Sequence, residues 1–513
     1  MLSVREDNRI LIEHHSLRVL GAVIAADEAH LISALQDATS SDYSTTPFFR
    51  RLTSPLLSPQ CAMLLLRQCG LPKMNYLTRC IPPACLATIT TAFDDTVAEV
   101  AFTKLDVRAA ERTALTLDIL RMPLRLGGFG LASTTDASPA AYIASLAAVA
   151  ASATTSISIL SASDDPDAAP SLPSDSLLYS WIESSIVSIR SQFTALQETA
   201  SDSRPIKVLR KLPSSPADFF THFHSRPQNA HRLQHFLVKQ ATHHRFHAAV
   251  EGARQDGDRA LVAHLLSFSA PRASTWKTVI PSHKLHTLAD SHYRVSARFN
   301  LGLRPYRTVL PDTRASCGTV DAMKRDPWHH LSCNHHKRQE ITLRHDTIVH
   351  ALYHHAHYSG AAAAMEPSGL NTEDGRRPDL HIVMSGLSIL TDVVVSHPLA
   401  PSHLSAASTK PLTTANQAAL RKHNKYKQLA GTQQSHFLPF AVETTGGMSE
   451  DAEELVNQLS LTCKDHLTLP SSRPFAHSIR SSIAIAIQRG NAITVQAGFS
   501  RAIMRAARQA AAA

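Results

Sequence analysis

Hydrophobic residues recur at intervals of three and four positions in the first part of the chain, most clearly over residues 56–71 and 93–121. This spacing gathers them on one side of an α-helix, so both stretches are predicted to be helical. Pro82-Pro83 separates the two stretches. Residues 152–176 have no such period and are rich in Ser, Ala, Asp and Pro, which is typical of a flexible linker and predicts a domain boundary.

Helical spacing resumes over residues 177–300, with interruptions near Pro205 and Pro213. The His- and Arg-rich stretch 231–247 is interpreted as the solvated face of a helix. From residue 338, β-branched runs alternate with helical spacing, which indicates an α/β unit and an α+β, multidomain fold class with a mostly helical N-terminal part. The elements expected there are helix 338–357, strands 378–384 and 387–395, helix 414–430, strand 436–443, and helices 451–468 and 474–490 before an Ala-rich end that is expected to fray.

Composition supports a folded protein throughout. The chain has 513 residues, of which 43% are hydrophobic and 18% charged, so we expect two or three domains. Its formal charge is +9, and residues from 301 onward carry 22 Lys and Arg against 16 Asp and Glu. Nucleic acid would therefore contact the C-terminal part, although many basic proteins bind no polymer.

Seven scattered cysteines, a charged N-terminus and the lack of an apolar run of about 18 residues bear on location. They predict reduced thiols and an intracellular protein that is neither secreted nor inserted in a membrane.

The segment 377–395, RPDLHIVMSGLSILTDVVV, carries the most chemical information. Ser385-Gly386 is a turn dipeptide between two β-rich runs, so a two-residue loop would pair the residues on either side of it. In that register Asp379 lies opposite Asp392, on one sheet face, with Cβ atoms about 4.5–5.5 Å apart. Two such carboxylates can bind one divalent cation, which would offset the cost of burying Asp392. Alternatively, Asp379 merely follows a proline at a strand start and Asp392 bonds to local backbone.

The predicted helix 414–430 carries small and apolar residues on one stripe, and Lys422, Lys425 and Tyr426 share that stripe. The two lysines are therefore aimed at the sheet that carries the aspartates. There a lysine would orient a water or stabilise the negative charge that develops on phosphorus during an in-line displacement. Snorkelling of a long side chain is the alternative.

Other charged residues can support this site. Arg344, His345 and Asp346 lie on the helix that precedes the hairpin, and Glu366 ends a short Ala-rich strand. Glu443 ends the strand 436–443, and it either reaches the metal or caps the following turn.

A second cluster of candidate metal ligands, with sulfur and nitrogen donors, lies upstream of the hairpin. Zinc prefers four ligands, and only two cysteines are close together here, so a histidine from 335–336 would have to complete the site. Surface histidines and ordinary thiols are the alternative. The candidate ligands are Cys317, His329 or His330, and Cys333.

The C-terminal part resembles the restriction-like endonuclease of non-LTR retrotransposons, an enzyme of the PD-(D/E)XK type that follows a reverse transcriptase in one polyprotein. Order and spacing agree over roughly 180 residues. The matching stretches are Leu-Ser-Cys at 331–333, Arg-His-Asp at 344–346, Glu-Pro-Ser-Gly-Leu at 366–370, Arg-Pro-Asp at 377–379, Thr-Asp-Val at 391–393, Lys422 with Lys425-Tyr426, Ala-Val-Glu-Thr at 441–444 and Gln-Arg-Gly-Asn-Ala at 488–492.

The resemblance implies the roles of these residues. Double-stranded DNA would be the substrate, with element RNA as a further partner and the nucleus as the location. The family's zinc knuckle usually has one more cysteine just before residue 317, where Ala315 and Ser316 stand, so a Zn²⁺ site would be incomplete. Asp379 and Asp392 would bind Mg²⁺ or Mn²⁺, Lys422 or Lys425 would supply the catalytic lysine, and Arg344, Arg376 and Arg377 would hold the DNA backbone.

Residues 19–24, 65–83 and 122–133 resemble the region after the palm of the same element's reverse transcriptase, including the thumb. The palm is missing and Phe93-Asp94-Asp95 lies in a stretch with helical spacing, so we expect no polymerase activity. The expected domains are a thumb-like helical remnant (1–151), a linker and helix (152–205), a helical connecting domain (206–312), a zinc-knuckle-like segment (313–337), the endonuclease domain (338–470) and C-terminal helices with a tail (471–513).

Two functions therefore remain open. The first is a metal-dependent endonuclease that nicks DNA as part of a truncated retrotransposon protein. The second is a catalytically inactive nucleic-acid-binding remnant. The intact aspartates and lysines favour the first, whereas the absent palm and the depleted zinc knuckle favour the second.

Overall fold

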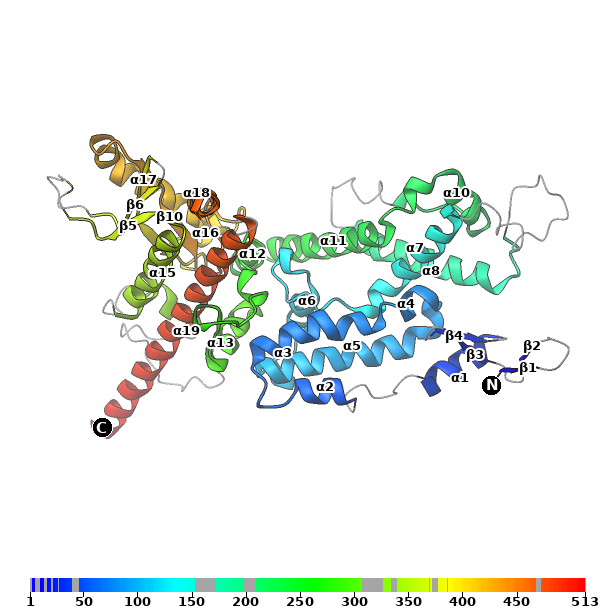
Figure 1. Cartoon of the computed structure of the whole chain (residues 1–513). Helices are drawn as coiled ribbons and strands as arrows, with labels where there is room; N and C mark the ends of the chain where they lie inside the picture. Colours follow the sequence, from blue (N-terminus) through cyan, green and yellow to red (C-terminus); the bar gives the residue numbers. More distant parts are fainter. Residues whose placement is uncertain are drawn as a thin grey trace. The chain divides into compact units, whose positions relative to one another are not determined.

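The chain divides into two compact units in a computed structural model (Figure 1). The first unit is built from residues 1–55, 65–101 and 131–252, and the second from residues 56–64, 102–130 and 253–513. No described helix is long and apolar enough to cross a membrane. The structure describes residues 2–4, 10–12, 16–19, 22–25, 27–38, 46–152, 172–197, 209–306, 326–333, 339–368, 370, 377–384, 386–466 and 472–512.

Helices dominate the first unit, as the hydrophobic spacing predicts, but the first 25 residues contain strands that this spacing did not reveal. β1 pairs with β2 and β3 with β4, both antiparallel. The strands are β1 (Leu2–Val4), β2 (Ile10–Ile12), β3 (Ser16–Val19) and β4 (Ala22–Ala25), and the main helices are α1 (Glu28–Ala38), α2 (Pro47–Leu52), α4 (Leu77–Cys80), α5 (Pro83–Leu105), α7 (Thr134–Ser152), α8 (Leu177–Gln197), α10 (Phe219–Ser225) and α11 (Leu233–Gln255).

One hydrophobic cluster joins the helices on both sides of the predicted linker. Ile143 of α7 packs in the same core as Ile186 of α8, Phe223 of α10 and Leu237 of α11. The compact units therefore do not divide at 152–176, contrary to the boundary predicted from composition. Most of that stretch, residues 153–171, lies outside the described part of the chain.

Asp94 has a structural role within the first unit. It is buried and lies in α5, so the helical prediction for 93–121 is confirmed around Asp94, although α5 ends at Leu105 and α6 begins only at Ala114. Its carboxylate accepts hydrogen bonds from the Ser133 hydroxyl at 2.7 Å and from the backbone N–H groups of Thr134 and Thr135 at 2.8 and 3.1 Å. Asp94 therefore satisfies N–H groups at the start of α7 that have no partner within that helix.

The second unit combines helices with a small mixed sheet. Helix predictions here are confirmed to within two residues at α15, α17 and α18. The elements are α3 (Pro59–Leu65), α6 (Ala114–Arg121), α12 (Arg259–Phe268), α13 (Asp290–Asn300), α15 (Gln339–Tyr358), β5 (Ala362–Met365), β6 (Leu380–Met384), β7 (Leu387–Thr391), β8 (Val393–Ser396), α16 (Leu404–Ala407), α17 (Thr413–Thr432), β9 (His436–Phe437), β10 (Phe440–Glu443), α18 (Glu450–His466) and α19 (Ser472–Ala512).

The hairpin register is confirmed. β6 and β7 pair antiparallel from Leu380 opposite Thr391 to Met384 opposite Leu387, as a two-residue loop requires. Gly386 in that loop has φ +82°, a conformation that suits glycine. The predicted strand 387–395 is interrupted at Asp392, where β7 ends and β8 begins.

β7 is a central strand, as expected for the apolar run that leads to Asp392, and the chain continues from it into β8. β7 lies between β6 and β9, and β8 pairs parallel with β10. The backbone N–H of Phe440 donates to the Asp392 carbonyl oxygen at 3.1 Å, which continues the pairing across the interruption.

Different helices cover the two faces of this sheet. Leu352 of α15 packs in one core with Ile389 and Val393, together with residues of α18 and α19. Tyr426 of α17 packs against Leu390 on the other face, because neighbouring residues of a strand point to opposite sides. α15 and α19 lie side by side, and α19 extends well beyond the helix expected at 474–490 (Figure 1).

Candidate functional site

Asp392 lies at the interruption between β7 and β8, and its side chain is only 6% exposed. Its carboxylate forms an ion pair with Lys422 of α17. The Tyr426 hydroxyl lies 2.7 Å from Asp392 Oδ1, and its oxygen accepts a hydrogen bond from Lys425 Nζ at 2.9 Å. The helical stripe that carries these three residues thus meets the sheet at Asp392, as the spacing predicts.

Asp379 precedes β6 and has different partners. Its Oδ2 accepts a hydrogen bond from the backbone N–H of Val393 at 2.6 Å, directly next to Asp392 in the chain. The same oxygen lies 3.0 Å from His345 Nε2, on α15. The other ring nitrogen of His345 lies 3.0 Å from Asp346 Oδ1.

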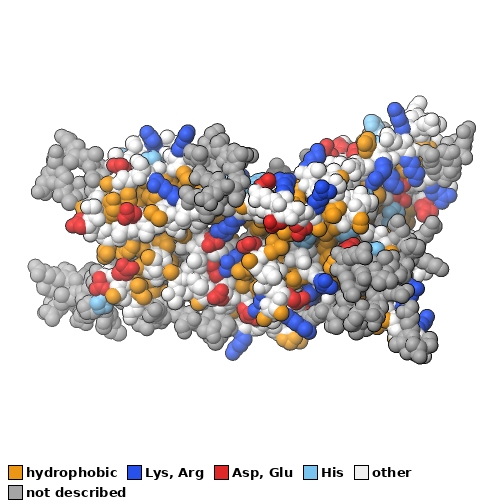
Figure 2. Space-filling view, turned by 180° about the vertical axis from the view of Figure 1, so that it is seen from behind, with side chains coloured by type: hydrophobic (Ala, Val, Ile, Leu, Met, Phe, Trp, Pro, Cys, Tyr) orange, Lys and Arg blue, Asp and Glu red, His pale blue; other side chains and the backbone are white. Residues whose placement is uncertain are grey.

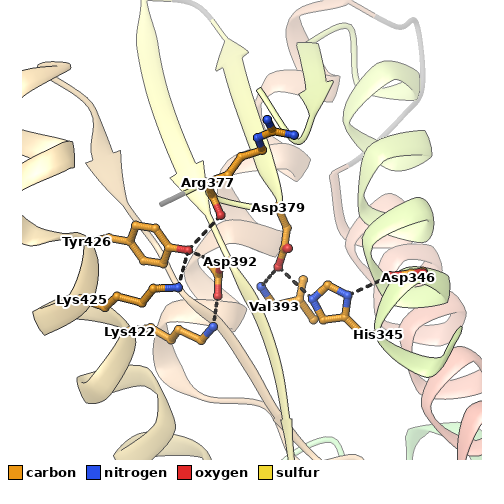
Figure 3. Close-up of polar contacts among 9 residues, drawn as sticks. All are labelled: His345, Asp346, Arg377, Asp379, Asp392, Val393, Lys422, Lys425 and Tyr426. Atoms are coloured by element: carbon orange, nitrogen blue, oxygen red, sulfur yellow. Dashed lines mark hydrogen bonds and ion pairs between the residues drawn. The ribbon is translucent and has the colours of Figure 1, made fainter. Parts of the chain in front are cut away.

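The two carboxylates therefore engage helices on opposite faces of the sheet (Figure 3). This differs from the expectation that they share one face. The last paired residues of the hairpin are Leu380 and Thr391, so the regular pleat does not extend to Asp379 and Asp392. Each side chain is then free to turn toward the cation that lies nearest to it.

His345 is positively charged at neutral pH. Burial favours its neutral form, but the hydrogen bonds and negative charges of Asp379 and Asp346 outweigh burial and raise the pKa of His345 to about 9. Each aspartate thus faces a cation supplied by the chain itself, Lys422 for Asp392 and His345 for Asp379.

Arg344 does not lie where a contact with DNA requires it. The residue is 2% exposed, and its Nη1 donates to Asn491 Oδ1 of α19 at 3.0 Å. Burial lowers the pKa of Arg344 to about 10, so it remains charged at neutral pH. In this structure Arg344 fastens α15 to α19, and the prediction that it holds the DNA backbone is corrected.

Glu443 is also buried, at 1% exposure, and burial raises its pKa to about 7. The backbone N–H groups of Thr414 and Ala415 donate to its carboxylate. Of the two alternatives left open by the sequence, Glu443 follows the capping one: its carboxylate accepts from the Thr445 hydroxyl at 3.2 Å in the following turn, and it also caps the start of α17.

Glu366 and Arg377 lie at the exposed edge of the site. Their side chains are 3.3 Å apart, and the backbone N–H of Glu366 donates to the Asp379 carbonyl oxygen at 2.9 Å. Glu366 thus touches Asp379 through its backbone, while its carboxylate faces Arg377. Arg376 lies outside the described residues.

The second cluster of candidate metal ligands is only partly described. Cys317 and residues 335–336 lie outside the described part of the chain. Cys333 is buried. Among the described residues, no group of three or more His, Cys, Asp and Glu side chains is arranged to hold a metal ion.

Two functional contacts were missed from the sequence. One is the backbone N–H of Val393, which holds Asp379. The other is Asn491, which bonds to Arg344 and donates to the Thr444 carbonyl oxygen at 2.7 Å. A backbone donor leaves no signal in the sequence, whereas Asn491 stands in the Gln-Arg-Gly-Asn-Ala stretch that already matched the resemblance.

No protein-family model and no curated protein matches this chain. Its function must therefore be argued from its own residues.

Asp379 and Asp392 have the donor type for a magnesium ion, although in this structure their carboxylates turn to opposite faces of the sheet. Both are carboxylates, the ligand type that Mg²⁺ prefers, and they occupy adjacent places at the ends of two paired strands. Asp392 is nearly enclosed, whereas Asp379 is 19% exposed. A shared ion would replace positive charge that Lys422 and His345 now supply.

Proposed function

We propose that the second unit is a metal-dependent DNA endonuclease of the restriction-like type, as the resemblance to non-LTR retrotransposon proteins implies. The observation that carries this proposal is the ion pair between Asp392 and Lys422 beside Asp379, at the ends of two paired strands. An acidic pair that holds a divalent cation next to a lysine would supply the electrostatic stabilisation that hydrolysis of a phosphodiester needs.

Asp379 and Asp392 would hold Mg²⁺ or Mn²⁺, which supplies Lewis-acid activation of the scissile phosphate when it is bound. Lys422 would orient the attacking water or stabilise the negative charge that develops on phosphorus. Tyr426 holds one oxygen of Asp392, and Lys425 bonds to that tyrosine. These contacts keep the aspartate in one orientation.

The surface of α17 supports DNA as the partner. Arg421, Lys425 and Lys427 are exposed, and the residues of α17 include no Asp or Glu. Basic side chains of this kind neutralise backbone phosphates without reading the base sequence.

A second function is favoured by one observation. Each aspartate is already balanced by a cation of the chain, so the same contacts would hold the fold together without a metal. This arrangement suits a nucleic-acid-binding remnant that no longer cuts.

Nicking of supercoiled plasmid separates the two functions. The wild-type chain should nick DNA with Mg²⁺ or Mn²⁺ and not with EDTA, and Asp392→Asn should reduce the rate by about a hundredfold or more. Asp256→Asn, at an exposed position, is the matched control. Equal rates for wild type and Asp392→Asn, or no nicking by either, would refute the endonuclease.

A second readout does not depend on turnover. Mg²⁺ should raise the melting temperature of the wild-type chain, and this shift should disappear in Asp392→Asn. A remnant without a metal site would show the same melting temperature with and without Mg²⁺.

A further inference from the structure

The C-terminal part of α19 extends past the end of its neighbouring helix. α15 and α19 are antiparallel, because Arg344 contacts Asn491 whereas the earlier Glu340 contacts the later Arg501. α15 begins at Gln339, so residues 502–512 of α19 continue beyond it. At 1.5 Å per residue this part is about 16 Å long. In Figure 1 it is the red helix that ends at the C-terminus.

This helix has an unusual charge pattern. From residue 466 to the end, the sequence contains no Asp or Glu. The arginines of this stretch are Arg473, Arg480, Arg489, Arg501, Arg505 and Arg508.

The arginines nearer the start of α19 have partners within the fold. Arg480 pairs with Glu453 at 2.8 Å. Arg489 donates to the carbonyl oxygens of Lys284 and Thr287, both at 2.8 Å. These contacts give Arg480 and Arg489 structural roles.

Arg505 and Arg508 lie on the projecting part and are exposed. With 100° between successive residues, positions 501, 505 and 508 fall within about 60° of one another around the helix. Arg501 pairs with Glu340, so it fixes which way this face points. Figure 2 shows blue side chains at this projecting end.

The candidate site and the projecting part lie at different levels along the α15–α19 pair. Glu340 and His345 are five residues apart on α15, a rise of about 8 Å, and His345 contacts Asp379. From Arg501 to Arg508 the rise is about 10 Å. One turn of B-form DNA spans about 34 Å, so a duplex cut at Asp379 is long enough to reach both exposed arginines.

We propose that Arg505 and Arg508 hold the phosphate backbone of the double-stranded DNA that occupies the candidate site, farther along the same duplex. The inference rests on the proposed function for the identity of the partner. A second copy of this chain fits the surface less well, because a two-fold contact would bring the same arginines face to face. The contact gives affinity and orientation, and it does not select a base sequence.

The test measures binding without cleavage. A labelled duplex of 30 base pairs is titrated with the full chain in EDTA by fluorescence anisotropy, over a range of salt concentrations. The variants are wild type, Arg505→Gln/Arg508→Gln, and the control Arg50→Gln/Arg51→Gln, which removes two exposed arginines of α2. Glutamine forms helices about as well as arginine, and circular dichroism confirms that the helix content is kept.

Each phosphate contact contributes about 0.9 to the slope of log affinity against log salt. Arg505→Gln/Arg508→Gln should therefore lower the slope by about 2 and weaken binding by roughly tens of fold at 0.1 M salt, whereas the control should match wild type. Equal slopes for the two double variants, absence of binding by wild type, or tighter binding of an RNA duplex than of DNA would overturn the proposal. So would a changed oligomeric state in sedimentation with unchanged DNA binding.

The outcomes separate this proposal from the proposed function. A reduced slope in a chain that does not nick plasmid supports the α19 contact and refutes the endonuclease. Nicking by wild type together with an unchanged slope in Arg505→Gln/Arg508→Gln supports the endonuclease and refutes the α19 contact.

Discussion

The ion pair between Lys422 and Asp392 gives a thermodynamic prediction that needs no substrate. Lys422→Met keeps most of the side-chain volume and removes the ammonium group, so Asp392 is left as a nearly enclosed carboxylate. Removing one partner of a fully buried pair costs about 3–5 kcal/mol. Lys422 is 24% exposed and Asp392 keeps its contact with Tyr426, so we expect a smaller loss of about 2–3 kcal/mol.

A double-mutant cycle isolates the interaction free energy between Lys422 and Asp392. Asp392→Asn retains an oxygen that can accept from Tyr426, and it removes the charge. When Lys422→Met is added to Asp392→Asn, the free energy of unfolding should fall only slightly. The coupling free energy between the two positions is then about 1.5–3 kcal/mol. For a unit of this size, the single Lys422→Met variant should melt roughly 3–5 °C below wild type in scanning calorimetry.

The reasoning fails if the two substitutions are additive. Additivity would mean that the two side chains do not interact in solution, and the grouping of Lys422 with Asp392 would have no basis. Circular dichroism of all four proteins at low temperature is the control for an altered fold.

Three further predictions concern the interior. Gly490→Ala should destabilise the second unit by about 1–3 kcal/mol, seen as a lower melting temperature, because its Cβ would lie 2.6 Å from the Arg344 Cβ. Lys277→Met should cost about 2–4 kcal/mol in urea unfolding, since the buried ammonium donates to the Gly127 carbonyl at 2.6 Å and to a second glycine carbonyl. Burial lowers the pKa of His264 to about 4 while the unfolded value is about 6.5, so the unfolded state binds more protons and up to about 3 kcal/mol of stability should be lost as pH falls from 6.5 to 4.

Matched variants test each of these. Gly431→Ala in α17 has open space around its Cβ and should leave stability unchanged or slightly raised, so an equal effect at Gly490 would contradict the close approach of α15 and α19. His264→Gln should flatten the pH dependence of the urea midpoint between pH 6.5 and 4. A wild-type slope in that variant would remove His264 as its source.

The hairpin could be predicted from the sequence because its information is local. A turn glycine and two short β-rich runs determine the register, and a shift by one residue would expose the apolar side. The direction of the aspartate side chains could not be predicted, because it depends on partners that lie 34 residues from Asp379 and 30 residues from Asp392. The regular alternation of side chains also stops at the ends of the strands.

The prediction that Arg344 holds the DNA backbone was wrong for a related reason. A helical arginine beside histidines has the pattern of a solvated face, and its burial depends on Asn491, 147 residues away. The shared core of α7 and α8 was equally hidden, since composition describes the stretch between two helices and not whether those helices meet afterwards. Local spacing therefore predicted the elements of the second unit, whereas contacts between distant segments decided the site.

The hydrogen bonds of Asn491 have a consequence for where mutations can disturb the candidate site. This amide joins the Thr444 carbonyl on one side and Arg344 on the other, and Arg344 is the chain neighbour of the histidine that faces Asp379. The rotation of α15 about its own axis is thus fixed by α19, which makes no described contact with either aspartate. Mutations that accumulate in α19 are therefore expected to alter the surroundings of the acidic pair at a distance, before either aspartate itself is replaced.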